Sequence, residues 1–271
     1  MQSNNPVFRN SDAFNGRSTY GSPSGYTDPS TWSTGSGTGA PPTVEERITI
    51  DSVVQKTAIT LGVIVVAAMV TWVLSGDLSA DENLGQLAAL AGVAALIAFG
   101  LSMVNSFKRV ISPALVLLFA AAEGVALGGI SKMFEAWYDG VVSGAILGTI
   151  AAFGGTLAAY KIFNIKVTSK FRRGVIAAMF GFIGVAILDS VLSLFDLDFG
   201  FNGFGTLGLL ASIGGLVLGV LMLILDFDFV EQAIRVGAPE RESWRAAFAL
   251  SVSLIWIYTN LLRILAIIQG E

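Results

Sequence analysis

The chain has 271 residues, of which 54% are hydrophobic and only 13% are charged, with a net charge of −4. A soluble domain of this length needs far more charge to cover its surface. The composition therefore excludes a soluble domain and indicates a membrane protein. There is no Cys and no His, which excludes disulfides, thiolate metal sites and histidine chemistry. Any proton-linked behaviour must therefore come from carboxylates.

The first 45 residues form a polar leader, rich in Ser, Gly, Asn, Thr and Pro and almost without aliphatic side chains. Such a segment cannot bury enough apolar area to offset its ordering entropy, so we predict a disordered cytoplasmic tail over 1–45. It lacks the basic and apolar regions of a signal peptide. Thr43 and Glu46 have the spacing of a capping box and predict a short helix before the first apolar stretch.

Seven apolar stretches follow, each long enough to cross a bilayer. Inside hydrocarbon every backbone polar group must be paired within its own segment, so these stretches must be helices. The sequence thus predicts an all-α membrane protein with a seven-helix transmembrane domain over 46–271. The predicted spans are 56–75, 86–105, 111–131, 141–161, 174–194, 206–227 and 246–268.

Basic residues lie almost entirely on alternate loops, which predicts the orientation of the bundle. One set of loops carries Lys108, Arg109, Lys161, Lys166, Lys170, Arg172, Arg173, Arg235, Arg241 and Arg245. The other set carries Lys132 together with Asp77, Asp81, Glu82, Glu135, Asp139, Asp196 and Asp198. We therefore expect a multi-pass protein of the cell membrane, with a cytoplasmic N-terminus and an external C-terminus.

Five charged residues fall within the predicted spans or at their inner ends: Glu123, Asp189, Asp226, Asp228 and Arg263. A charge at the centre of a membrane helix costs at least about 2.5–3.5 kcal/mol, so each is a functional candidate. The alternative is a fixed internal pair or a side chain that snorkels to the headgroups. Arg263 lies five residues from the outer end of its span, and snorkelling is the preferred interpretation for it.

The third span contains Glu123 beside Gly124 and Gly128, which are four residues apart. Small residues at this spacing let another helix approach closely, so the two glycines predict a helix–helix contact. A carboxylate beside that face is expected to point into the bundle.

The sixth span ends in Asp226, Phe227, Asp228 and, three residues on, Glu231. Residues two apart on a helix diverge by about 200°, so the two aspartates cannot share a face. One is expected to face the bundle and the other the headgroups. Glu231 is placed to pair with Arg235 at the i,i+4 spacing. Gly237 and Pro239 should end a helix that projects beyond the bilayer.

Several enzyme classes are excluded by what these motifs lack. Asp189 and Asp226 lie on neighbouring spans but without the glycine-flanked context and shared depth of an intramembrane aspartic protease. There is no GxSxG motif, and without His no Ser–His pair can form. Asp196 and Asp198 begin like a calcium-binding EF-hand loop, but Leu207 stands where that loop requires Glu. We therefore expect no catalysis, no resident cofactor and no nucleic-acid partner, and the sequence assigns no metal ligands.

Three motifs carry a resemblance to a known family. AAEGVALGGIS in the third span, LDFDFVEQAI followed by RVGAPE after the sixth, and TNLLRILAI in the seventh resemble the Bax-inhibitor-type (transmembrane Bax inhibitor motif) family. The long Gly/Ser/Pro-rich leader is similar to its bacterial branch, which implies the bacterial inner membrane. The resemblance covers residues 45–268.

The resemblance implies six helices around a central seventh and a pH-sensitive calcium leak governed by an aspartate pair between the last two helices. The sixth-helix acid maps onto Asp226 or Asp228, with Glu231 a third possibility. The seventh helix holds no acid between Ala246 and Ile268, and Ser253 falls near the partner position. A single acid hydrogen-bonded by a polar residue, Ser251, Ser253, Thr259 or Asn260, with Arg263 nearby, would be a different switch.

Our leading hypothesis is a pH-sensitive calcium or cation leak channel gated by buried carboxylates, since hard cations need oxygen ligands and this chain offers no soft ones. The candidate sensors are Asp226, Asp228, Glu123, Glu231 and Asp189. One alternative is a non-transporting membrane protein that modulates other membrane proteins. Another is a small secondary transporter, although no two halves show the matching broken helices of such folds.

Overall fold

The computed structural model describes residues 46–76, 78, 81–197 and 199–270, so the predicted tail over 1–45 lies outside the described residues. All seven helices are long and apolar enough to cross a membrane, which confirms the predicted all-α transmembrane fold. They are α2 (Ile50–Leu74), α3 (Asp81–Phe107), α4 (Pro113–Trp137), α5 (Val141–Ile162), α6 (Ser169–Ser193), α7 (Thr206–Arg235) and α8 (Glu242–Gly270).

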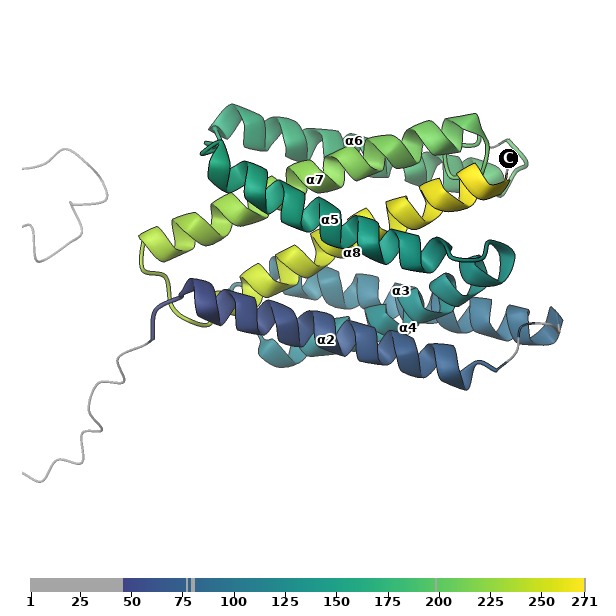
Figure 1. Ribbon diagram of the computed structural model, residues 1–271, viewed down its shortest axis with the longest axis horizontal. Coiled ribbons are helices and arrows are strands. Elements are labelled where there is room, and N and C mark those ends of the chain that lie inside the picture. The colour runs from purple at the N-terminus through teal and green to yellow at the C-terminus, as the bar shows by residue number, and fades with distance from the viewer. Residues whose placement is uncertain (1–45, 77, 79–80, 198, 271) are drawn as a thin grey trace, which may run out of the picture. The chain divides into compact units, whose positions relative to one another are not determined.

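The last helix, α8, is the central one, as the family resemblance implied. It packs against α2, α4, α5 and α7, whereas α3 packs on α4, and α6 packs mainly on α7, with a ring contact from Phe182 to Trp256 of α8. Figure 1 shows α8 in yellow running between the other helices. The core follows α8: Ile257 and Leu262 on this helix are fully buried, as is Leu223 on α7.

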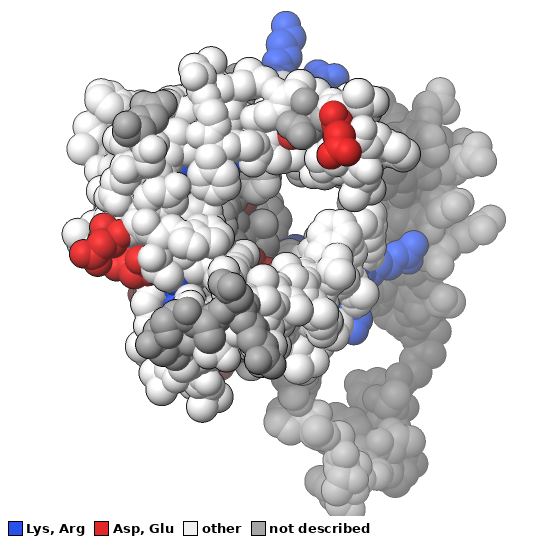
Figure 2. Space-filling model, turned by 90° about the vertical axis from the view of Figure 1, so that its right-hand side faces the viewer, with Lys and Arg blue, Asp and Glu red and all other residues white. Residues whose placement is uncertain are grey.

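Successive helices are antiparallel, so charged loops gather at two ends of the bundle. The basic end, as we name it, holds the start of α2, α4, α6 and α8 and the loops 108–112, 163–168 and 236–241. The acidic end holds the loops 138–140 and 194–205. Figure 2 looks onto the acidic end, where carboxylates lie on the surface and a hollow opens between the helices.

The chain enters the bundle differently from the sequence-based expectation. The predicted helix at Thr43–Glu46 is wrong for its described part: Arg47 is extended and forms an antiparallel bridge with Pro239. Helix α2 begins at Ile50, with Thr49 as its N-cap in a reciprocal capping box with Ser52. This capping box satisfies the first backbone donors of α2 and leaves the preceding residues free to pair with another segment.

The glycine pair of the third span makes the predicted close contact, and its partner is α2. A Cβ atom on Gly128 would lie 2.5 Å from the carbonyl oxygen of Ala68 and 2.8 Å from its Cα. A Cβ on Gly124 would lie 2.7 Å from the side chain of Ala67. Only glycine therefore fits at these two positions of α4.

Candidate functional site

The central polar contact of the bundle joins α7 to α8. Ser253 Oγ donates a hydrogen bond to Asp226 Oδ2 at 2.5 Å. Ser253 is buried, and so are Leu223 and Ile257, which lie one turn away on the same helix faces. The half-buried carboxylate of Asp226 is thus held against α8 by a neutral hydroxyl, which stands at the position where the family resemblance implied a second acid.

Asp228 faces a different helix. Arg172 Nη2, in the first turn of α6, donates to Asp228 Oδ2 at 2.7 Å, and Gln232 Nε2 donates to the same oxygen at 2.5 Å. The two aspartates thus point to different neighbours, as the helical geometry requires. The expectation that one would meet the headgroups is wrong, because Asp228 is buried against α6 by this ion pair.

Glu231 completes a charged group at the basic end. It pairs with Arg235 at 2.6 Å, the i,i+4 pair that the sequence predicted, and accepts a hydrogen bond from Tyr160 Oη of α5 at 2.8 Å. The ring of Tyr160 also packs on Phe227, with 5.8 Å between centroids. The end of α7 is therefore connected by polar contacts to both α5 and α6.

Asp189 lies near the opposite end of the bundle and holds a loop. Its carboxylate accepts hydrogen bonds from the backbone N–H groups of Phe199 (3.0 Å) and Asn202 (2.7 Å). The side chain of Asn202 returns a bond to the carbonyl of Ala186. Asp189 is thus separated from Asp226 and fixes the loop between α6 and α7.

Arg263 fixes the same loop from α8. Its Nη2 donates to the carbonyls of Phe201 and Gly203, each at 2.6 Å. The snorkelling interpretation is therefore wrong, because the guanidinium group satisfies backbone carbonyls that have no helical partner.

Asn260 does not reach the acids either. Its Nδ2 donates to the carbonyl of Trp256 in its own helix at 2.8 Å, and the amide packs against Gly215. Trp256 Nε1 in turn donates to the Gly215 carbonyl at 2.7 Å. These contacts hold α8 against the half of α7 nearer the acidic end.

Glu123 stands apart from the other candidates. It is half-buried on α4, and within the described part of the chain no hydrogen bond or ion pair of its carboxylate is found. It therefore joins no second helix, whereas Asp226 and Asp228 both do.

Sequence reasoning missed two residues of this site. Arg172 was counted only as a marker of orientation, and Tyr160 was not considered. Both lie far from their acidic partners in the sequence, so no local spacing could have paired them. The sequence did offer one indication. An acid within the membrane needs a hydrogen-bond donor, and the loop between the fourth and fifth spans is rich in Lys and Arg.

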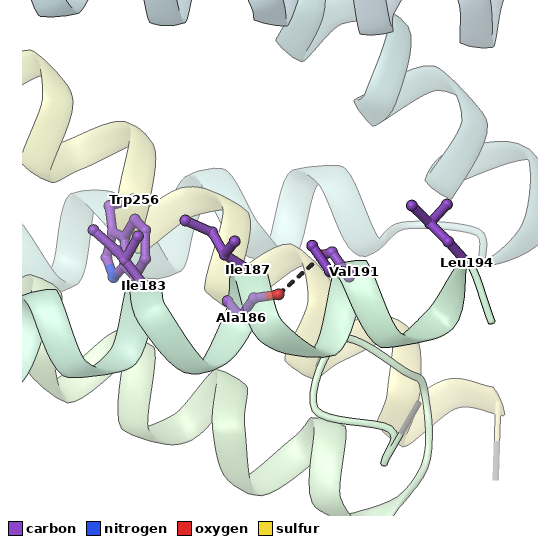
Figure 3. Close-up of a pocket in the computed structure, with 7 residues that line it drawn as sticks. Ile183, Ala186, Ile187, Val191, Leu194 and Trp256 are labelled. Carbon is purple, nitrogen blue, oxygen red and sulfur yellow. Dashed lines mark hydrogen bonds between the residues drawn. The ribbon is translucent and has the colours of Figure 1, made fainter. Parts of the chain in front are cut away.

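A separate apolar pocket of about 420 Å³ opens beside α6. Ile183, Ile187, Val191 and Leu194 line it along α6, and Trp256 of α8 closes one side (Figure 3). The remaining lining residues, Ala186 and Ser190, are bonded to each other through the Ser190 hydroxyl. No carboxylate lines this pocket, so it is not part of the charged site. Among the described residues no three acidic side chains come together as a metal site.

Six described spanning helices around a central α8, with a half-buried carboxylate bonded across α7 and α8, define a polytopic α-helical membrane protein. Within that class the chain matches the family model described as Bax inhibitor 1 like over residues 5–270. The chain therefore belongs to the Bax inhibitor 1-like family. No curated protein matches it.

Proposed function

We propose that the protein is a pH-sensitive calcium leak of the cell membrane, in which the contact between Asp226 and Ser253 acts as the gate. The observation that carries this proposal is the 2.5 Å hydrogen bond between them, which joins the central helix to α7 inside the core. The proposal includes the bacterial inner membrane, a cytoplasmic basic end and an external C-terminus. It involves no catalytic step and no resident cofactor.

The direction of the pH dependence follows from the chemistry of this bond. A hydrogen bond to an ionised carboxylate is about twice as strong as one between neutral groups. Protonation of Asp226 therefore weakens the contact and loosens α7 from α8. Without His in the chain, a carboxylate is the group that can respond near neutral pH. The leak should rise as pH falls.

The ligand chemistry supports a hard cation. Calcium prefers oxygen ligands, and the half of α7 nearer the basic end offers the carboxylates of Glu231, Asp228 and Asp226, with the hydroxyl of Ser253 beside Asp226. The weakly attached helix beside these carboxylates is α6, which packs mainly on α7 and reaches α8 through the ring contact of Phe182 with Trp256. A widening between α6 and α7 would therefore disturb few other contacts.

Purified protein in liposomes with an internal calcium dye tests the proposal. Asp226→Asn and Ser253→Ala each remove the charge-assisted bond, which is worth about 1.5–3 kcal/mol, so the leak at neutral pH should rise by about tenfold or more. The pH profile should flatten in both variants. Ser251→Ala is the matched control, because Ser251 is also buried on α8 but its hydroxyl has no hydrogen-bond partner within the described part of the chain.

The outcomes separate the three functions. An unchanged leak and pH profile in both variants would refute the carboxylate gate. No flux at any pH would favour the non-transporting protein that modulates other membrane proteins. Flux that requires an opposing ion gradient would favour a secondary transporter.

A further inference from the structure

The residues Glu46–Thr49, which we call the strap, run extended along the turn between α7 and α8. The backbone N–H of Ile48 donates to the carbonyl of Ala238 at 2.9 Å, and that of Glu240 donates to the carbonyl of Glu46 at 2.6 Å. Arg47 and Pro239 lie opposite each other between these two bonds. The strap therefore fixes the turn that connects the two helices of the gate.

A single apolar side chain anchors the strap. Ile48 is 2% exposed, whereas Ile50, two residues later, is 66% exposed. Ile48 belongs to the same hydrophobic cluster as Phe227 and Leu250. Phe227 is the neighbour of Asp226 in the sequence, and Leu250 lies one turn before Ser253. The anchor thus belongs to the hydrophobic cluster that extends from the strap toward the contact between α7 and α8.

Two polar contacts extend this connection along α2. Lys56 is buried, forms an ion pair with Glu240, and places its Nζ 5.7 Å from the ring centroid of Trp244. The hydroxyl groups of Ser52 and Ser243 lie 2.7 Å apart. The start of α8 is therefore held against α2 through the turn that the strap also binds.

We propose that the strap is a releasable coupling that controls the α7–α8 helix pair, which loosens when Ile48 detaches from its hydrophobic cluster. An isolated pair of short strands is only marginally stable in water, and Glu46 and Arg47 are exposed, so the strap can open while the seven helices stay folded.

Release of the strap should change the contact between Asp226 and Ser253, because α8 is a continuous helix. Ser253 lies about 16 Å along the axis from the start of α8, at about 1.5 Å per residue. Displacement of the α7–α8 turn therefore tilts or rotates the face that carries Ser253. The effect on calcium flux rests on the proposed function, but the movement of the turn does not.

The closing experiment combines a release variant with a reversible lock. In this Cys-free chain, spin labels at Lys108→Cys and Val236→Cys, both exposed, report the distance between the end of α3 and the α7–α8 turn. Ile48→Ser should broaden this distance distribution and raise the leak by about tenfold, since it removes a fully buried aliphatic side chain. Ile50→Ser is the matched control and should change neither.

The lock is the unlabelled Arg47→Cys/Pro239→Cys variant. Opposed residues between two such bonds have Cα atoms about 4.5 Å apart, within the disulfide range of about 4.4–6.8 Å. Oxidation should lower the acid-evoked leak and hydrogen exchange at the α7–α8 turn, and reduction should restore both.

The two proposals fail separately. If Ile48→Ser broadens the distance while neither it nor Asp226→Asn changes the flux, the coupling stands and the carboxylate gate is wrong. If Ile48→Ser matches Ile50→Ser in distance and flux, the coupling is wrong. Should Ile48→Ser not fold, an oxidised lock that leaves both leak and exchange unchanged would overturn the coupling.

Discussion

The ion pair between Arg172 and Asp228 should respond unequally to removal of its two partners. The side chain of Arg172 is 45% exposed, while that of Asp228 is only 12% exposed. Arg172→Gln therefore leaves a carboxylate in the bundle with Gln232 as its remaining donor. Asp228→Asn instead leaves a guanidinium group that water can solvate. The loss of the cation should be the more damaging change.

The expected loss in the free energy of unfolding depends on how deeply this ion pair is buried. Removal of one partner from a fully buried pair costs about 3–5 kcal/mol, whereas an exposed pair contributes about 0.2–1 kcal/mol. For Arg172→Gln we expect a loss of about 1–3 kcal/mol in the free energy of unfolding, intermediate between these limits. For Asp228→Asn we expect about 1 kcal/mol or less, because no buried charge remains. The double variant should resemble Asp228→Asn alone.

Unfolding of the protein in lipid–detergent mixtures, followed by far-UV circular dichroism, measures these free energies. Arg173→Gln is the control, since among the described residues its guanidinium group bonds only the carbonyl of Ser169 one turn earlier. Its effect should stay within about 0.5 kcal/mol. Equal losses for Arg172→Gln and Asp228→Asn, or a larger loss for Asp228→Asn, would refute the assignment of a buried anion with an exposed cation.

Three further predictions concern packing, orientation and the leader. Gly128→Ala should destabilise the bundle by about 1–3 kcal/mol, because its Cβ would strike the α2 backbone, whereas Gly100→Ala, with nothing within 4 Å, should be neutral or stabilising. Thermal unfolding compares the two, and equal effects would contradict the close contact. Cysteines at Ser169 and Asp139 should label from opposite sides of the membrane, and labelling of both from outside would reject the orientation. Deletion of 1–42 should preserve helical content and monodispersity in detergent, since this polar segment has little apolar area to bury; loss of either would show that the leader is needed for folding.

The sequence predicted the seven helices because a membrane helix satisfies its own backbone, and its apolar length alone reveals it. The start of α2 was placed six residues too late, at 56 instead of Ile50. The polar residues Lys56 and Thr57 end the apolar run there, yet both are buried. Lys56 is accommodated by Glu240, which is distant in the sequence, so no local pattern could have placed it inside the helix.

The candidate site was predictable as a set of residue types but not as a set of pairs. Helical geometry separated Asp226 from Asp228 and paired Glu231 with Arg235, because those relations lie within one helix. It could not show that Arg172 approaches Asp228, or that Asp189 and Arg263 meet one loop. Those contacts depend on which helices become neighbours and on how a loop folds back.

Most other charged groups near the helix ends have fixed partners, which leaves Asp226 as the acid best placed to act as the proposed switch. Lys132 donates to the carbonyls of Trp72 and Gly76 at the end of α2, and Arg245 donates to those of Lys108 and Arg109 after α3. Together with Arg263, these cations are committed to backbone carbonyls that lack helical partners.

The acids of α7 then differ in what protonation would do. Asp228 and Glu231 each have an arginine partner, so a proton there must break an ion pair. Asp226 is bonded to a neutral hydroxyl and forms no ion pair within the described residues. A proton or a cation arriving at Asp226 thus neutralises a charge in the core and weakens a contact between two helices in the same event. Glu123 can also be neutralised without breaking an ion pair, but it bonds no second helix, so its titration would leave the helix–helix contacts as they are.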